Sequence, residues 1–433
     1  MTSAIRGAFL SYTGNPFKEP VESTYRHELD GLIVVVDGKI AYAGAYAAGR
    51  VPAGVTPEHH RDGLIVPGFI DAHVHYPQTP MIGAYGRQLL DWLNKYTFVT
   101  EQRYHDKNFA RRIAKIFLRE QLRAGVTTPV TYATVHPESV DAYFEEAEAL
   151  SLRTGTGKVL MDRNAPEALL DTVQTGYDQS KALAEKWHGR GRFFYVVTPR
   201  FAPTSTPAQL EAAGSLYKEI PGVYVQTHLA ENQSEVRWVA EMYPDSKHYL
   251  DVYDKYGLVG PRTLFGHAVH LTDAEWARMA EAGATIVHCP TSNLFLGSGL
   301  FHLERALVSS NPVRTALGSD VGGGTSLSPL ITLNEAYKIA QLRGYSLSAH
   351  HAFYLATLGS ARAIYQDEHI GSIETGKDAD LAVLDFKATP LLAERQSYAQ
   401  SLEEQLFVLM TLGDERAIKA TYVAGRKVHE RDA

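Results

Sequence analysis

The chain has 433 residues, of which 45% are hydrophobic and 21% are charged, as in an ordinary globular protein. Its 42 basic and 49 acidic residues give a net charge of −7 without a basic run, which argues against a nucleic-acid partner. The single cysteine, Cys289, excludes an internal disulfide and fits a reducing cytoplasm. With no apolar run of about 18 residues and no apolar leader, the sequence predicts neither a membrane span nor secretion.

Both ends of the chain have the pattern of β structure. Residues 31–43 predict a hairpin that turns at Asp37-Gly38, a pair that suits a tight two-residue turn. Residues 380–386 and 420–430 predict further strands near the other end. We therefore expect a small β-sandwich domain made of residues 1–66 and 370–433.

The middle of the chain alternates short apolar runs with helical patterns. Helices are expected at 106–124, 207–220, 235–256 and 272–282. Eight strands separated by helices predict an α/β fold, a (β/α)8 TIM-type barrel that spans residues 67–369. The expected barrel strands are 64–73, 126–134, 158–163, 193–200, 223–228, 263–270, 285–290 and 314–320.

Metal-binding residue types stand at the ends of three expected barrel strands, where barrels of this kind carry their chemistry. His73 and His75 are two positions apart on an extended strand, so both imidazoles can reach one ion. His228 and Asp320, at the ends of later strands, complete a nitrogen-rich set that suits zinc. Such an ion lowers the pKa of bound water to about 7, which makes hydroxide available at neutral pH.

Each of these residues has an ordinary structural explanation when it is taken alone. A single His-x-His pair occurs by chance, and His228 or His267 alone reads as a packed core histidine. Glu231 could simply be the acidic start of a helix, and Arg200 a salt-bridge partner. The combination of three histidines and an aspartate at strand ends, in barrel order, favours a metal site.

Three neighbouring residues suit the chemistry of such a site. Glu231 follows His228 by three residues and could act as a general base and then a general acid. His267 would lie at the site, and Arg200 has fixed donors that can bind a carbonyl oxygen. Cys289 has no general base assigned to it, so we interpret it as a small buried residue.

The chain carries five motifs, which are PGFIDAHVH (67–75), HLAE (228–231), FGHAVH (265–270), HCPTSN (288–293) and GSD (318–320). Together these motifs resemble those of the metal-dependent amidohydrolase superfamily, and the resemblance covers nearly the whole chain. The segment 371–385 also resembles the return of that superfamily into its small β domain. Residues 73–101 (HVHYPQTPMIGAYGRQLLDWLNKYTFVTE) and VTPRF at 197–201 show a narrower resemblance, to the guanine deaminase family.

The resemblance implies a cytoplasmic homodimer that deaminates guanine hydrolytically, with no membrane or nucleic-acid partner. It implies that Glu231 shuttles protons, with His267 and Asp320 as further catalytic groups that orient the attacking water. His228, His267 and Asp320 would also face the substrate. The implied zinc ligands are His73, His75, His228 and Asp320. The implied purine contacts are Gln78, Trp92, Leu93, Arg200 and Phe201.

The sequence leaves alternatives open for the substrate, for catalytic activity and for the identity of the metal. Two-metal members of the superfamily carry a modified lysine at the end of the fourth strand, where this chain has Arg200, so we expect one Zn²⁺ per subunit. A related aminohydrolase that acts on a triazine, a pterin or another purine would use the same residues. A catalytically silent binding module is disfavoured, because the four ligands and Glu231 are all present. The sequence does not separate zinc from iron or manganese.

Overall fold

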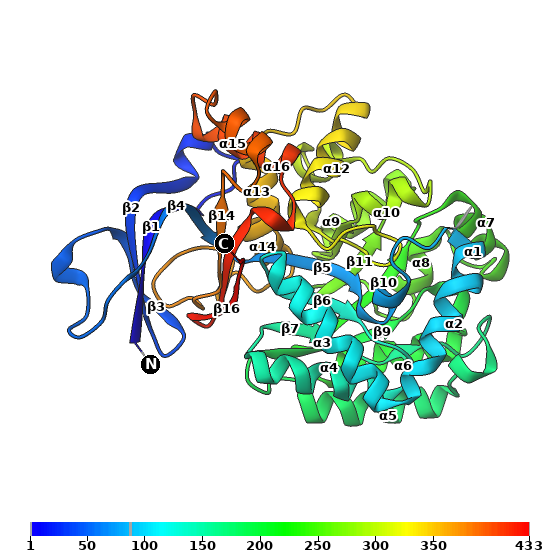
Figure 1. The fold of residues 1–433 in the computed structure, drawn as a ribbon. Coiled ribbons are helices and arrows are strands. Elements are labelled where there is room, and N and C mark those ends of the chain that lie inside the picture. Colours follow the sequence, from blue (N-terminus) through cyan, green and yellow to red (C-terminus); the bar gives the residue numbers. More distant parts are fainter. Residues whose placement is uncertain (1, 86–88, 433) are drawn as a thin grey trace.

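The computed structural model describes residues 2–85 and 89–432, which form two sheets (Figure 1). A seven-stranded sheet takes its strands from both ends of the chain, and the segment between them forms a parallel barrel surrounded by helices. In Figure 1 the seven-stranded sheet lies to the left of the barrel, and both chain ends belong to its strands. The nested arrangement that was expected from the two β-rich ends is thus confirmed.

The terminal sheet has the strand order β16-β15-β14-β4-β1-β2-β3. The predicted hairpin at 31–43 is confirmed, since β2 and β3 pair antiparallel around Asp37 and Gly38. Both turn residues have positive φ, 49° and 81°, which a tight two-residue hairpin turn requires. The strands are β1 (Thr2–Tyr12), β2 (Tyr25–Val36), β3 (Lys39–Ala45), β4 (Glu58–Pro67), β14 (Leu381–Asp385), β15 (Ile418–Val423) and β16 (Arg426–Glu430).

The barrel strands run parallel in the order β5-β6-β7-β9-β10-β11-β12-β13, and β8 pairs with β9 beside this path. Two backbone hydrogen bonds join the two ends of the path: Asp320 N donates to His73 O at 2.8 Å, and His75 N donates to Val321 O at 2.7 Å. The strands are β5 (Phe69–His75), β6 (Val126–Tyr132), β7 (Thr154–Thr156), β8 (Val159–Leu160), β9 (Phe193–Pro199), β10 (Tyr224–Leu229), β11 (Thr263–His267), β12 (Thr285–His288) and β13 (Arg314–Leu317).

The expected strand at 64–73 is wrong as a single element. Residues up to Pro67 belong to β4 of the terminal sheet, and β5 of the barrel begins at Phe69. The chain changes sheets at Gly68, where an added Cβ would lie 2.1 Å from Thr127 Oγ1. Because the residues on both sides are buried and mostly apolar, hydrophobicity alone did not reveal this division.

The third position of the barrel also differs from the expectation of one strand at 158–163. It is shared by the short strands β7 and β8, and β7 lies N-terminal to the expected range. Glycines at 155 and 157 interrupt the β-branched and aromatic pattern by which strands are recognised. An added Cβ at Gly157 would lie 1.8 Å from Val196 O, so close backbone packing explains this glycine.

The helices confirm three of the four expected segments, at α3, α6 and α9. The fourth, 235–256, is two helices, α7 and α8, because Pro244 follows the end of α7 and cannot continue a helix. The helices are α1 (Leu89–Trp92), α2 (Phe98–Glu101), α3 (Lys107–Arg123), α4 (Pro137–Leu150), α5 (Val173–Trp187), α6 (Pro207–Glu219), α7 (Gln233–Met242), α8 (Tyr249–Asp254), α9 (Asp273–Ala282), α10 (Pro290–Phe295), α11 (Leu303–Val308), α12 (Pro329–Leu342), α13 (Ala349–Tyr354), α14 (Ser360–Ala363), α15 (Pro390–Gln396) and α16 (Leu402–Leu412).

A buried charge network joins the barrel to the terminal sheet. Arg153 and Arg192 immediately precede β7 and β9, and their side chains meet Asp378 and Asp380 just before β14. The Arg153 and Arg192 guanidinium nitrogens lie 2.8 and 2.9 Å from Asp378 Oδ2. The division into domains at 1–66 plus 370–433 and at 67–369 stays a prediction, with this network as a contact across it.

We expect Asp378→Asn to destabilise the fold by about 3–5 kcal/mol at neutral pH, because it leaves the buried Arg153 guanidinium without its counter-ion and Arg192 with Asp380 alone. Burial alone would raise the pKa of Asp378, but Arg153 and Arg192 lower it to about 2. Since this lies below the unfolded value of about 3.9, the stabilisation exists above that value and is lost as the pH falls toward 2. Urea denaturation between pH 6 and pH 3 measures the difference.

The matched control is Asp30→Asn, which breaks the exposed ion pair with Arg6. An exposed pair contributes about 0–1 kcal/mol, so this variant should unfold close to the wild type. Equal losses in both variants would contradict the role assigned to the buried network.

Candidate active site

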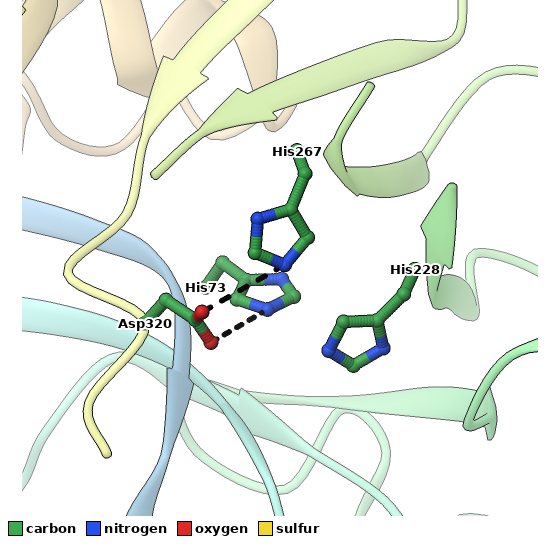
Figure 2. Close-up of side chains that lie close together, drawn as sticks. All are labelled: His73, His228, His267 and Asp320. Carbon is green, nitrogen blue, oxygen red and sulfur yellow. Dashed lines mark ion pairs between the residues drawn. The ribbon is translucent and has the colours of Figure 1, made fainter. Parts of the chain in front are cut away.

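Five of the predicted residues converge at the carboxyl ends of the barrel strands. His73 and His75 end β5, His228 and His267 lie at the ends of β10 and β11, and Asp320 follows β13. Figure 2 shows His73, His228, His267 and Asp320 pointing toward one another. Asp320 Oδ1 lies 3.2 Å from the Nε2 atoms of both His73 and His75, and Asp320 Oδ2 lies 3.7 Å from His267 Nε2.

Contacts outside this cluster set the tautomer of His228. Its Nδ1 lies 2.7 Å from the carbonyl oxygen of Arg200, an acceptor, so Nδ1 carries the proton and donates it there. The Nε2 lone pair then faces the site, 3.3 Å from His75 Nε2. A carbonyl that orients a histidine in this way is typical of metal ligands in proteins.

The cluster has the chemistry of a metal site. Ligand atoms of His73, His228, His267 and Asp320 all lie within 4.8 Å of one another. Nε2 of His73 and Nε2 of His267 are buried without a hydrogen-bond partner, which is costly unless a cation binds them. The predicted ligand His75 is outside that group of four but shares its contacts to Asp320 and His228. Imidazole nitrogens with one carboxylate oxygen suit a divalent transition metal.

The protonation states of the histidines and the aspartate in this cluster also favour the binding of a metal cation. Burial lowers the pKa of His75 to about 4 and that of His267 to about 3, so both imidazoles are neutral at physiological pH. Burial would raise the pKa of Asp320, but its close contacts with the imidazoles of His73 and His75 hold it well below the ordinary value. Neutral imidazoles around an ionised carboxylate are in the state that metal binding requires.

Glu231 follows β10 and lies beside this cluster. Its Oε2 is 3.5 Å from His267 Nε2, and its Oε1 accepts a hydrogen bond from Ser298 at 2.9 Å. Burial raises the pKa of Glu231 well above the ordinary value, and the carboxylates of Asp320 and Glu235 add to that rise. A carboxyl group with a raised pKa can take a proton and return it near neutral pH, as general acid–base catalysis requires.

The pocket above the cluster encloses about 410 Å³ of space that protein atoms do not fill, part of it open to solvent. Trp92, Leu93 and Phe201 supply apolar surface, and Gln78 and Arg200 supply hydrogen-bond donors. The predicted residues that line it are His75, Gln78, Trp92, Leu93, Arg200, Phe201, His228, Glu231, His267 and Asp320. His73 lies beneath them, in contact with Asp320. All the predicted site residues are therefore brought together, and the roles assigned to them stay predictions.

Several residues at the site were not singled out from the sequence. Leu296 and Gly323 line the pocket, and Glu235 both lines it and accepts hydrogen bonds from the backbone amides of Glu231 and Asn232. Asn293, in the HCPTSN motif, lies with its side-chain nitrogen 3.0 Å from His267 Nδ1. The HCPTSN motif could have indicated Asn293, whereas no motif in the sequence indicated Leu296 or Gly323.

Some of the strained backbone of the protein lies at these strand ends. His267, Ala268 and Asp320 have φ values of 70°, 51° and 49°, in the left-handed region that non-glycine residues rarely adopt. Such strain persists where the surrounding structure enforces it, which happens most often at functional sites.

Cys289 is buried, and its burial raises the pKa of the thiol well above the ordinary value, which agrees with its interpretation as a packed residue.

A sequence profile described as the amidohydrolase family matches residues 64–428. The chain belongs to the amidohydrolase family. It is 50% identical to the guanine deaminase of Escherichia coli strain K12 over 434 residues, which covers 99% of this chain and 98% of that protein. The structure of E. coli guanine deaminase superposes with a TM-score of 0.96 at 48% identity, with both chains fully covered.

A solved structure of lower sequence identity also matches nearly the whole length of this chain. It is described as guanine deaminase from C. acetobutylicum with bound guanine in the active site. The TM-score is 0.89 at 28% identity, and the match covers 99% of this chain and 100% of that one. The likeness therefore includes the terminal sheet as well as the barrel.

We expect Zn²⁺ added to chelator-treated protein to raise its thermal unfolding midpoint, because a ligand that binds only the folded state stabilises it. At a thousandfold excess over Kd the gain is about 4 kcal/mol. Asp320→Asn should remove most of this gain, since asparagine tolerates the left-handed backbone but lacks the charge. Scanning calorimetry and metal analysis measure both effects.

His302→Asn is the matched control, because it removes a histidine that lies in a separate surface cavity. This variant should keep the full zinc-dependent rise. A rise of wild-type size in Asp320→Asn would show that the metal binds somewhere other than this cluster.

Proposed function

We propose that this protein is a zinc-dependent guanine deaminase that converts guanine and water to xanthine and ammonia. The observation that carries the proposal is one pocket in which Gln78 and Arg200 face the same space as Glu231 and the histidine–aspartate cluster. The 50% identity to E. coli guanine deaminase along the whole chain supports the same substrate. The guanine-bound relative, which matches 99% of this chain, supports it further.

His73, His75, His228 and Asp320 would hold one zinc ion per subunit. The neutral imidazoles of His75 and His228 and the ionised carboxylate of Asp320 fit that group. When bound, zinc supplies a water whose pKa is lowered to about 7, a nucleophile that is available at neutral pH. His267 lies across the cluster from Asp320, and both side chains would orient that water.

The pocket suits a flat and neutral heterocycle. The Arg200 guanidinium is a planar donor that can bind the carbonyl oxygen of guanine, and Gln78 can bind the adjacent polar edge. Phe201, Trp92 and Leu93 would pack against the ring. These contacts would hold C2 of guanine over the cluster, so that attack occurs within a fixed geometry.

Glu231 would carry the proton between water and substrate. Its carboxylate takes a proton from the attacking water and delivers it to N3 of guanine as oxygen bonds to C2. The tetrahedral carbon that results loses the amino group as ammonia after a second proton transfer, in which Asp320 and His267 take part. Hydrogen bonding from Ser298 holds Glu231 in place throughout.

The cellular setting is also part of the proposal. We infer a cytoplasmic homodimer, because a single cysteine fits a reducing compartment and the resemblance implies two subunits. Within residues 2–85 and 89–432, the helices are too short or too polar to span a bilayer. The net charge of −7 gives no support for a nucleic-acid partner.

We expect zinc-loaded protein to release ammonia from guanine and to leave adenine, cytosine, pterin and melamine largely unchanged. Adenine and melamine lack the carbonyl acceptor that Arg200 requires, and a site left with unpaired buried donors loses binding free energy. Cytosine and pterin carry a carbonyl, but on a ring system that is smaller or larger than that of guanine. An ammonia assay across this panel measures the preference. Turnover of another ring with guanine ignored would favour the alternative, a related aminohydrolase for a triazine, a pterin or another purine.

We expect Glu231→Gln to lower kcat by about 10²–10⁴-fold, because glutamine keeps the shape but cannot accept and return a proton. Zinc content and the thermal midpoint should stay near wild-type values, since Glu231 lies outside the predicted ligand set. Steady-state kinetics with metal analysis on the same sample tests this expectation. Near wild-type turnover would remove Glu231 from the mechanism.

A further inference from the structure

Glu101 is a buried carboxylate that lies directly behind the two polar side chains of the pocket. It ends the short helix α2, and its side chain is 1% exposed. Its Oε2 accepts a hydrogen bond from Arg200 Nη1 at 2.7 Å, and its Oε1 accepts one from Gln78 Nε2 at 3.2 Å. One carboxylate therefore fixes the orientation of both side chains.

The hydrogen bonds of Gln78 require that residue 101 accept a hydrogen bond from the Gln78 side-chain amide. Gln78 Oε1 accepts from the backbone amide of Gly322 at 3.1 Å, so its Nε2 must point toward Glu101. A carboxylate accepts at both oxygens, whereas an amide at position 101 would accept at one atom only. Either Arg200 or Gln78 would then face a donor and lose its hydrogen bond.

The same contact sets the charge of the pocket. A buried guanidinium without a counter-ion attracts anions strongly, because Coulomb interactions are weakly screened in a low-dielectric interior. Glu101 lies against Arg200 and compensates its charge, so the pocket presents hydrogen-bond donors with little net positive charge. Such a pocket binds a neutral carbonyl-bearing ring in preference to an anionic one.

We propose that Glu101 is a positioning and specificity-determining residue, which orients Gln78 and Arg200 and makes the pocket select neutral ring substrates over anionic ones. The proposal rests on the proposed function for the identity of the ring. It has a consequence for the product, since xanthine is a stronger acid than guanine and is readily ionised. The carboxylate of Glu101 would weaken retention of the xanthine anion.

The test compares wild type, Glu101→Gln and Glu101→Asp, each loaded with zinc. Calorimetry at about pH 8 measures the Kd of xanthine, largely an anion there, and of hypoxanthine, largely neutral. For Glu101→Gln we expect the ratio of the xanthine Kd to the hypoxanthine Kd to fall at least tenfold. Its KM for guanine should rise at least tenfold, with a smaller change in kcat, because the ring is less well held.

Glu101→Asp keeps the charge but is one methylene too short to reach both partners. It should keep the wild-type Kd ratio while its KM for guanine rises, which separates the role of charge from that of geometry. The matched control is Glu148→Gln, which breaks an exposed bidentate pair with Arg190 and should change neither quantity. If Glu101→Gln does not fold, the Kd ratio and KM of Glu101→Asp decide the question.

An unchanged Kd ratio and KM in Glu101→Gln, with wild type active on guanine, would overturn the proposal for Glu101 alone. Loss of selectivity in Glu101→Asp as severe as in Glu101→Gln would overturn the charge argument. If wild type leaves guanine unchanged, the proposed function fails. The Kd ratio from calorimetry still tests Glu101 in that case, since the binding measurement needs no turnover.

Discussion

The first strand of the barrel and the segment that follows the last strand meet through two backbone hydrogen bonds, and the site depends on this seam. Asp320 N donates to His73 O, and His75 N donates to Val321 O. These bonds join residues about 250 positions apart in the chain and bring the carboxylate of Asp320 to 3.2 Å from both imidazoles of β5. A shift at the seam would separate the ligand atoms, so closure of the barrel and assembly of the site are one event.

Much of the fold was predictable because barrel strands and helices leave separate periodic patterns in the sequence. The strand predictions at 64–73 and 158–163 failed because the hydrophobic pattern does not show which strand pairs with which. The run 64–73 is apolar except for Asp71 and His73, although Gly68 divides it between two sheets. The glycines at 155 and 157 make room for the Phe194 side chain and for Val196 O. These features are set by tertiary contacts, which a single sequence does not display.

The candidate site was predictable for a different reason. Residues at the carboxyl ends of parallel strands must meet, so His73, His228 and Asp320 could be grouped before any distance was known. Glu101 could not be found in this way, because it belongs to a series of short helical turns between β5 and α3 rather than to the end of a barrel strand. Its contact with Arg200 joins positions 99 residues apart and exists only in the folded chain.

The residues predicted to bind the metal and those that determine ring preference lie in different parts of the chain. The predicted metal ligands lie on or shortly after the regular strands of the barrel. Glu101 instead comes from the 89–101 segment, which also supplies Trp92 and Leu93 to the lining of the pocket. Changes within this segment leave the strand seam and its backbone hydrogen bonds intact. Ring preference can thus be altered, in evolution or in the laboratory, by exchanging one short stretch of chain on a barrel whose hydrolytic chemistry is unchanged.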